Sequence, residues 1–415
     1  MRSETFEILR CPYCGGRLDL VTSSYHRLEG DDVMDGILGC QCCVFPVVDG
    51  IPIMHLLPPT TTARELVEQG NPSRARSVMF GLDDDAEMQR LDALIASPDP
   101  TYRAVVDALG PHLEAGYFLY RFSDPTFLVV DAVARTISRA VLGRGGRAID
   151  ICGGSGHLTR SLMDVSSPAP VLADLYFAKI WLARRFTAPG CEPVCCDGNA
   201  PMPFARGAFR YAMCSDAFMY IWTKRQFVLD MLRLVDGPGP RAAVITHTHN
   251  QCTWSPSHGQ PLTPAGYRNL FETLPARVYG ESALFEDVVQ GGPLDLSRRE
   301  PEETLEANPA LTLVASTEPA VFAPQALDAP SLQARGEFRI NPLYTVTANG
   351  DALDLRLQFP SDDYADEYGA CRRYLPEQVT LPRSATTALA SGRAPDALAD
   401  LVRRHVIVDL PNRYY

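Results

Sequence analysis

The chain has 415 residues, of which 46% are hydrophobic and 21% charged, so it can bury the cores of two or three folded units. No run of about 18 apolar residues appears and the first residues lack a signal-peptide pattern, so we expect a cytoplasmic protein without a membrane span. The formal net charge of −12 makes nucleic acid an unfavourable partner, because an acidic surface repels phosphates.

Two Cys-x-x-Cys pairs lie near the N-terminus, Cys11 with Cys14 and Cys40 with Cys43. Four thiolates on two tight turns suit a tetrahedral, structural Zn²⁺ ion, which would stabilise a segment too short for a large core. Cys42 is an alternative ligand, but the two-residue spacing favours Cys43. A segment that has lost its metal and persists through packing is the other alternative.

The flanking residues Leu9–Leu18 and Phe45–Met54 complete a first unit, 1–57. This unit resembles the zinc-ribbon family that includes the activator subunits of tRNA and protein methyltransferases. A similar ribbon precedes the catalytic domain of a ribosomal-RNA methyltransferase. The ribbon is itself net acidic, which is unfavourable for binding RNA, so a protein-facing or intramolecular role is easier to defend.

Residues 58–145 are expected to form a linker and a helical cap. Pro58–Thr62 have the composition of a linker, and helices are expected over 101–109 and 126–142. The aromatic segment Tyr117–Phe122 either lines a pocket or packs within a helical layer.

The stretch Arg147–Leu158 reads as a short buried strand, a glycine-rich turn and the start of a helix. Its glycines let backbone N–H groups approach a ligand closely, because no Cβ stands in the way. An acidic residue, Asp174, follows the next apolar pair. That spacing brings a carboxylate to the end of a second strand, where it can bind ribose hydroxyls.

Two more strands end in acidic residues, at Asp197 and at Asp216. This order resembles the class I S-adenosylmethionine-dependent methyltransferases, in particular the ubiquinone and menaquinone branch. The resemblance implies a seven-stranded Rossmann-like α/β domain over 146–316 that binds S-adenosyl-L-methionine. Carried over by position, the cofactor residues are Asp150, Ile151, Cys152, Gly153, Gly154, Gly156, Asp174, Leu175, Asp197, Gly198 and Ser215. Cys152 stands where the family usually has a glycine.

The fifth strand, 241–250, ends in two histidines. Histidine suits proton removal from an acceptor near neutral pH, and strand alternation points His247 and His249 to one face of the sheet. We expect His249 as the catalytic base in preference to His247, with Asp216 orienting the acceptor. Packed strand-end residues are the alternative reading. His258 lies on a loop expected above the same crevice.

The remaining residues, 317–415, form an α+β extension in which 339–347 and 352–359 look like a hairpin around Asn349-Gly350. Methyl transfer to the O, N or C atom of a small molecule is the leading function. An RNA methyltransferase and a non-catalytic cofactor-binding scaffold are the alternatives. The oligomeric state and the role of the ribbon cannot be read from the sequence.

Overall fold

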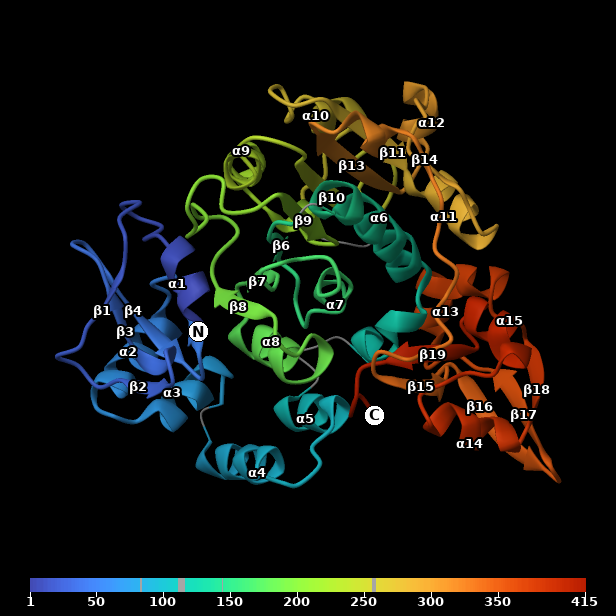
Figure 1. The fold of residues 1–415 in the computed structure, drawn as a ribbon, viewed down its shortest axis with the longest axis horizontal. Coiled ribbons are helices and arrows are strands. Elements are labelled where there is room, and N and C mark those ends of the chain that lie inside the picture. Colours follow the sequence, from blue (N-terminus) through green and yellow to red (C-terminus); the bar gives the residue numbers. More distant parts are fainter. Residues whose placement is uncertain (83, 111–115, 144, 256–258) are drawn as a thin grey trace.

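The computed structural model describes residues 1–415 except 83, 111–115, 144 and 256–258. Its centre is a seven-stranded sheet in the order β11-β13-β10-β9-β6-β7-β8 (Figure 1). Only β13 among these strands runs antiparallel to its neighbours. The strands are β6 (Ala148–Ile151), β7 (Val171–Asp174), β8 (Glu192–Cys195), β9 (Tyr211–Ser215), β10 (Ala242–His249), β11 (Ala276–Gly280) and β13 (Ala310–Ser316). The predicted seven-stranded α/β fold is confirmed.

The strands of this sheet are buried on both sides because helices cover both of its faces. Ala148 of β6 packs in the cluster that contains Val133 of α6, whereas the next residue, Ile149, packs with Met231 of α9. The helices that follow the first strand are short or interrupted near the glycine turn. Their bounds are α6 (Pro125–Leu142), α7 (Thr159–Leu162), α8 (Phe177–Leu182), α9 (Lys224–Leu234), α10 (Pro264–Arg268), α11 (Glu281–Val289) and α12 (Glu302–Glu306).

The N-terminal residues form a small antiparallel sheet that lies beside β8 (Figure 1). Its elements are α1 (Ser3–Ile8), β1 (Asp19–Leu20), β2 (Arg27–Glu29), β3 (Asp32–Gly39), β4 (Val44–Val48) and β5 (Ile51–Pro52). Ile53 forms a parallel bridge with Cys195, and the N–H of Met54 donates to the Cys195 carbonyl at 2.7 Å. Phe45 of this ribbon shares a buried cluster with Val194 of β8. The ribbon therefore extends the core of the central domain.

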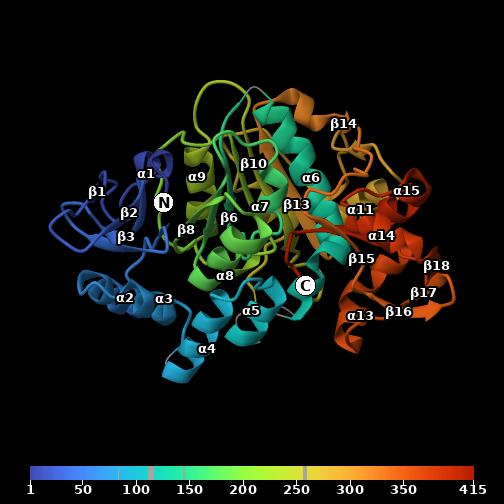
Figure 2. The ribbon, with the colours of Figure 1, turned by 60° about the horizontal axis from the view of Figure 1, so that its bottom comes forward.

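The cap consists of α2 (Pro58–Glu68), α3 (Pro72–Met79), α4 (Asp85–Ile95), α5 (Tyr102–Leu109) and the 3₁₀ helix η1 (Gly116–Ser123). Figure 2 shows α2 to α5 along the lower side of the molecule, with α2 and α3 beneath the N-terminal sheet. The expectation of a linker at Pro58–Thr62 is wrong, because these residues begin α2. Proline at the first helical positions loses no intrahelical hydrogen bond, so the Pro-Pro pair starts this helix.

The C-terminal extension contains a two-stranded and a three-stranded sheet around a buried cluster to which Leu128 of α6 also belongs. The predicted hairpin is present in β16 (Tyr344–Asn349) and β17 (Ala352–Leu357), whereas Arg339 and Ile340 belong to β15. Strand β15 pairs with the last strand, β19, which brings the C-terminus back to the cap. The other elements are β14 (Pro324–Gln325), which pairs with β12 (Leu294–Asp295) outside the extension, β15 (Glu337–Ile340), α13 (Asp362–Tyr368), β18 (Gln378–Pro382), α14 (Ser384–Ala390), α15 (Ala399–Arg403) and β19 (Ile407–Leu410).

Among the helices of the described ranges, none combines the length and the apolar composition needed to cross a membrane.

Candidate active site and metal centre

The glycine-rich turn after β6 adopts a conformation that side chains rarely tolerate. Gly154 and Gly156 have φ values of +54° and +75°, and Cys152 has φ +59°. A Cβ on Gly153 would come within 2.4 Å of Leu172, and one on Gly156 within 2.7 Å of Ala183. A glycine adopts a positive φ with less backbone strain than a cysteine, so a cysteine at position 152 is unusual.

The space next to Gly154 is open, since a Cβ there would meet no atom within 4 Å. The Gly154 N–H donates to Asp174 Oδ2 at 3.0 Å, and the Tyr176 N–H donates to Asp174 Oδ1 at 2.9 Å. Asp174, at the end of β7, is therefore fixed beside the turn by two backbone donors. Burial raises the pKa of its carboxyl group.

Asp150 lies beneath the same turn and is fully buried. Its Oδ2 accepts a hydrogen bond from Thr159 Oγ1 at 2.6 Å, but its Oδ1 has no partner within the described residues. Burial raises the pKa of Asp150 to about 7, and the neighbouring Asp174 carboxylate adds to this effect. Three more buried hydroxyl oxygens at this edge of the sheet have no partner in the described ranges: Ser155 Oγ, Ser215 Oγ and Thr246 Oγ1.

Unpartnered buried polar atoms are rare in proteins, because each costs on the order of 1–3 kcal/mol. Their gathering at the carboxyl ends of β6, β9 and β10 fits a polar ligand at this edge, which is where ligands bind open α/β sheets.

The other predicted cofactor residues lie along the same edge. Asp197 follows β8 by two residues, and its Oδ1 accepts from the Asn199 N–H at 2.8 Å. A Cβ on Gly198 would come within 3.2 Å of Cys152 Sγ, so the glycine lets the cysteine pack there. Leu175 directly follows β7, and the Ile151 end of β6 pairs with Ala173 and Cys214. The parallel order β9-β6-β7-β8 thus places the ends of these strands side by side.

Tyr414, near the C-terminus, packs against His157, which directly follows the glycine turn. The sequence did not suggest this contact. Tyr414 is buried; its OH lies 2.7 Å from His157 Nε2 and donates to the Phe118 carbonyl at 2.8 Å. Its ring stacks on Tyr102 of α5 at 4.6 Å. Phe122 packs against His157 and Tyr414, so it belongs to this aromatic layer. Only contacts between distant segments create the layer, and no local pattern signals it.

Asp216, His247 and His249 come together at the ends of β9 and β10. One ligand atom from each lies within 4.8 Å of the others. The pairing of β10 with β13 shifts register between Ile245 and Thr248, and His247 has φ +47°. This bulge interrupts the alternation expected from the sequence, yet the two rings remain neighbours with centroids 5.9 Å apart. His258 lies outside the described residues.

Glu281, at the start of α11, is the functional candidate that the sequence reasoning missed. It is buried; its Oε2 lies 2.7 Å from His247 Nδ1, and its Oε1 accepts from the His247 N–H and from Thr312 Oγ1. Burial lowers the pKa of His247, but the Glu281 carboxylate outweighs this and raises it to about 9. A carboxylate just past the end of the sixth strand was the available signal, since that end lies at the ligand edge.

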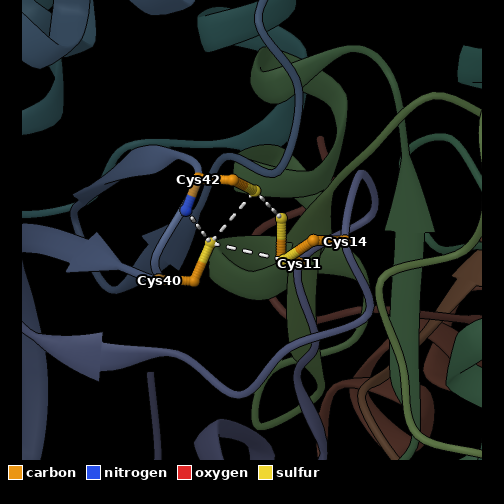
Figure 3. Close-up of side chains that lie close together, drawn as sticks. All are labelled: Cys11, Cys14, Cys40 and Cys42. Atoms are coloured by element: carbon orange, nitrogen blue, oxygen red, sulfur yellow. Dashed lines mark hydrogen bonds between the residues drawn. The ribbon is translucent and has the colours of Figure 1, made fainter.

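The four N-terminal sulfurs that gather belong to Cys11, Cys14, Cys40 and Cys42 (Figure 3). The Sγ–Sγ distances are 3.6 Å for Cys11–Cys42, 3.7 Å for Cys14–Cys40 and 3.5 Å for Cys40–Cys42. Four sulfurs about 2.3 Å from a tetrahedral Zn²⁺ would lie about 3.8 Å apart, so the residues fit this ion.

The spacing of the second pair favoured Cys43 as the fourth ligand, and the structure brings Cys42 into the group instead. The N–H groups of Cys42 and Cys43 both donate to Cys40 Sγ, at 3.4 and 3.3 Å, which forms the tight turn. Cys43 precedes β4, its carbonyl accepts from the Cys40 N–H, and its side chain packs against the ribbon core. The two cysteines are adjacent in sequence and their sulfurs lie 3.4 Å apart, so spacing alone could not decide between them.

No protein-family model and no curated protein matches this sequence. Among solved structures, the chain is similar to an S-adenosylmethionine-dependent methyltransferase of Aquifex aeolicus, at 12% identity over 48% of this chain and 96% of that one, with a TM-score of 0.33. A second such enzyme, from Mesorhizobium loti, matches at 13% identity over 41% and 90%, with a TM-score of 0.31. Geranyl diphosphate C-methyltransferase of Streptomyces coelicolor matches at 12% identity over 42% and 72%, with a TM-score of 0.31. Each of these matches covers less than half of this chain.

Proposed function

We propose that this protein binds S-adenosylmethionine at the glycine turn and transfers its methyl group to a small-molecule acceptor. The observation that carries the proposal is the pair of buried carboxylates at the turn: Asp174 is held by the Gly154 N–H, and Asp150 Oδ1 has no partner among the residues that the structure describes. Buried carboxylates without a cationic partner are costly, and a ligand with positive groups and ribose hydroxyls offsets that cost.

The residues of this chain have distinct roles in the proposal. S-adenosylmethionine supplies an electrophilic methyl group on a positively charged sulfur. Asp150, Gly153, Gly154 and Gly156 hold its methionine part, Asp174 with Leu175 accepts the ribose hydroxyls, and Asp197 with Gly198 binds the adenine. Because methyl transfer is an in-line displacement, alignment and exclusion of water contribute most, and the aromatic layer around Tyr414 excludes water on the helical side.

The acceptor would enter where β9 and β10 end, next to Ser215 and the group formed by Asp216, His247 and His249. These polar side chains stand at the strand ends adjoining the glycine turn, because β9 lies between β6 and β10. Their role is to hold and orient a polar atom of the acceptor.

A small molecule is favoured over RNA because carboxylates outnumber cations around this crevice. Asp124, Asp216 and Glu281 lie near two cations: Arg121, which contacts Asp124 and Asp216 at 3.3 Å each, and His247, which pairs with Glu281. This local excess agrees with the net charge of −12. A phosphate backbone gains affinity from basic patches, which this edge does not provide among its described residues.

The acceptor class is tested by incubating the full-length protein with methyl-labelled S-adenosylmethionine and, separately, a small-molecule extract, total RNA and total protein. We expect label in the small-molecule fraction only. Transfer of label to RNA alone would contradict the proposal and support the alternative, an RNA methyltransferase. Cofactor binding without transfer to any fraction would favour a scaffold.

The affinity for S-adenosylmethionine is expected to depend on pH through Asp150. Burial raises the pKa of this carboxyl to about 7, so it loses its charge as the pH falls through that value. A cationic ligand prefers the charged form, and the dissociation constant should therefore be about tenfold larger at pH 6 than at pH 8.

Calorimetric titration at both pH values measures this dependence. The Asp150→Asn variant should bind more weakly at pH 8 and lose this dependence on pH. An equal affinity of the wild-type protein at both pH values would contradict a contact between Asp150 and the positive groups of the ligand.

The four ribbon cysteines Cys11, Cys14, Cys40 and Cys42 are proposed to hold a structural Zn²⁺ ion. A closed four-sulfur site leaves no coordination position for substrate, so the ion would act only on folding. Its place beside β8 makes the ribbon a support for the strand that ends near the adenine site.

A further inference from the structure

We propose that Asp216, His247 and His249 form a second metal site, which binds a divalent transition-metal ion of the Co²⁺ to Zn²⁺ type at the acceptor end of the crevice. One ligand atom of each residue already lies within 4.8 Å of the others. Two imidazoles and one carboxylate are a donor set for Zn²⁺ and for Fe²⁺ sites that keep open positions. Ligands about 2.1 Å from an ion lie about 3.0–3.4 Å apart, so binding requires only a small closure of the three side chains.

Each histidine ring is oriented by a hydrogen bond at one nitrogen. His247 Nδ1 lies 2.7 Å from Glu281 Oε2, and His249 Nδ1 lies 2.9 Å from Ser255 Oγ. Within the described residues, neither Nε2 atom has a hydrogen-bond partner. A carboxylate that binds the far nitrogen of a ligating histidine fixes the tautomer that leaves Nε2 free for the metal.

The backbone at this site is held in unusual conformations. Asp216 and His247 have φ values of +53° and +47°, in the left-handed region that non-glycine residues avoid. The strain at His247 coincides with the bulge of β10, and Glu281 holds it there by accepting from the His247 N–H at 2.6 Å. Strained residues that the surrounding structure fixes in place cluster at functional sites. The strain at Asp216 and His247 is therefore consistent with a role as metal ligands.

The excess of carboxylates around this site also favours the binding of a cation. Asp216, Glu281 and Asp124 are negative, and Arg121 is the one guanidinium paired with this group among the described residues. Once a metal ion takes the place of the His247 proton, the three carboxylates and Arg121 leave two net negative charges, which one divalent ion balances. Arg121 binds Asp216 through Oδ2 only, so the other carboxylate oxygen remains for the ion.

Three protein ligands leave coordination positions open, unlike the four-sulfur site of the ribbon. An oxygen or nitrogen atom of the acceptor would fill one of them, which orients the acceptor next to the glycine turn. Metal binding by these residues does not depend on the proposed methyl transfer, so each can fail without the other.

The test is a titration of the full-length, chelator-treated protein with Co²⁺, followed by absorption spectroscopy and without S-adenosylmethionine. We expect two ions per chain. One has the thiolate charge-transfer bands of the ribbon site, and the other has visible bands without thiolate character. His249→Ala and Asp216→Asn should each abolish the second component and leave the first unchanged, whereas the matched control His26→Ala should retain both.

Glu281→Gln keeps all three ligands and should weaken the second component about 10–100-fold, the usual effect of losing such a supporting carboxylate. Circular dichroism of each variant verifies the fold. A wild-type protein that takes up only the thiolate-bound ion would overturn the proposal. So would a second component that survives intact in folded His249→Ala and Asp216→Asn.

Discussion

Replacing Asp174 with alanine is expected to weaken S-adenosylmethionine binding by ~100-fold or more. The carboxylate would accept the two ribose hydroxyls, and hydrogen bonds to a charged group contribute about 1.5–3 kcal/mol each. The loss should appear in equilibrium dialysis with labelled cofactor as a larger dissociation constant and the same number of sites.

Asp174 also accepts from the Gly154 and Tyr176 N–H groups, so the alanine variant loosens the turn. Asp174→Asn keeps one oxygen acceptor for the turn and should retain more affinity than the alanine variant. Asp351→Ala, at an exposed hairpin turn, is the matched control and should bind as the wild type does. Unchanged affinity in a folded Asp174→Ala protein would remove this residue from the cofactor site.

The second large effect is expected from loss of the ribbon metal. Cys42→Ser removes one of the four gathered sulfurs, and the free energy of unfolding should fall by about 4 kcal/mol, the stabilisation given by a ligand at a thousand times its Kd. The effect should reach the cofactor domain, because the ribbon and β8 share a buried cluster. Chemical denaturation and metal analysis of the purified protein measure both consequences.

Cys43→Ser is the control that tests the choice between adjacent cysteines. Its sulfur lies 3.4 Å from Cys42 Sγ but outside the four-sulfur group, so this variant should retain one ion per ribbon and near-normal stability. If instead the metal is lost in Cys43→Ser and kept in Cys42→Ser, the fourth ligand is Cys43, as the Cys-x-x-Cys spacing predicted. Equal stability of all three proteins would mean that the ribbon folds by packing alone.

The central sheet could be predicted because its evidence is local. The first four strands, from Ala148 to Ser215, are apolar segments of four or five residues that end within two residues of a glycine or an acidic residue, and their order agreed with the seven-stranded resemblance. The turn at Gly153–Gly156 could be placed for the same reason, since its glycines are adjacent in sequence.

The features that were missed depend on contacts between distant segments. The bulge at His247 arises where β10 pairs with β13, and Glu281 reaches it from a helix 34 residues further along the chain. Tyr414 enters the aromatic layer because β19 pairs with β15 and returns the C-terminus to the cap. Periodicity within one segment cannot reveal such pairings. The domain boundaries and the functional assignment of the site residues stay predictions.

The central claim is that the glycine turn with Asp150 and Asp174 is a site for a nucleoside sulfonium. Calorimetric titration of the full-length protein with S-adenosylhomocysteine and S-adenosylmethionine tests it most directly. The account predicts one site per chain with a dissociation constant in the micromolar range, on the order of −8 kcal/mol. Absence of heat together with an unchanged melting temperature for both ligands would contradict it.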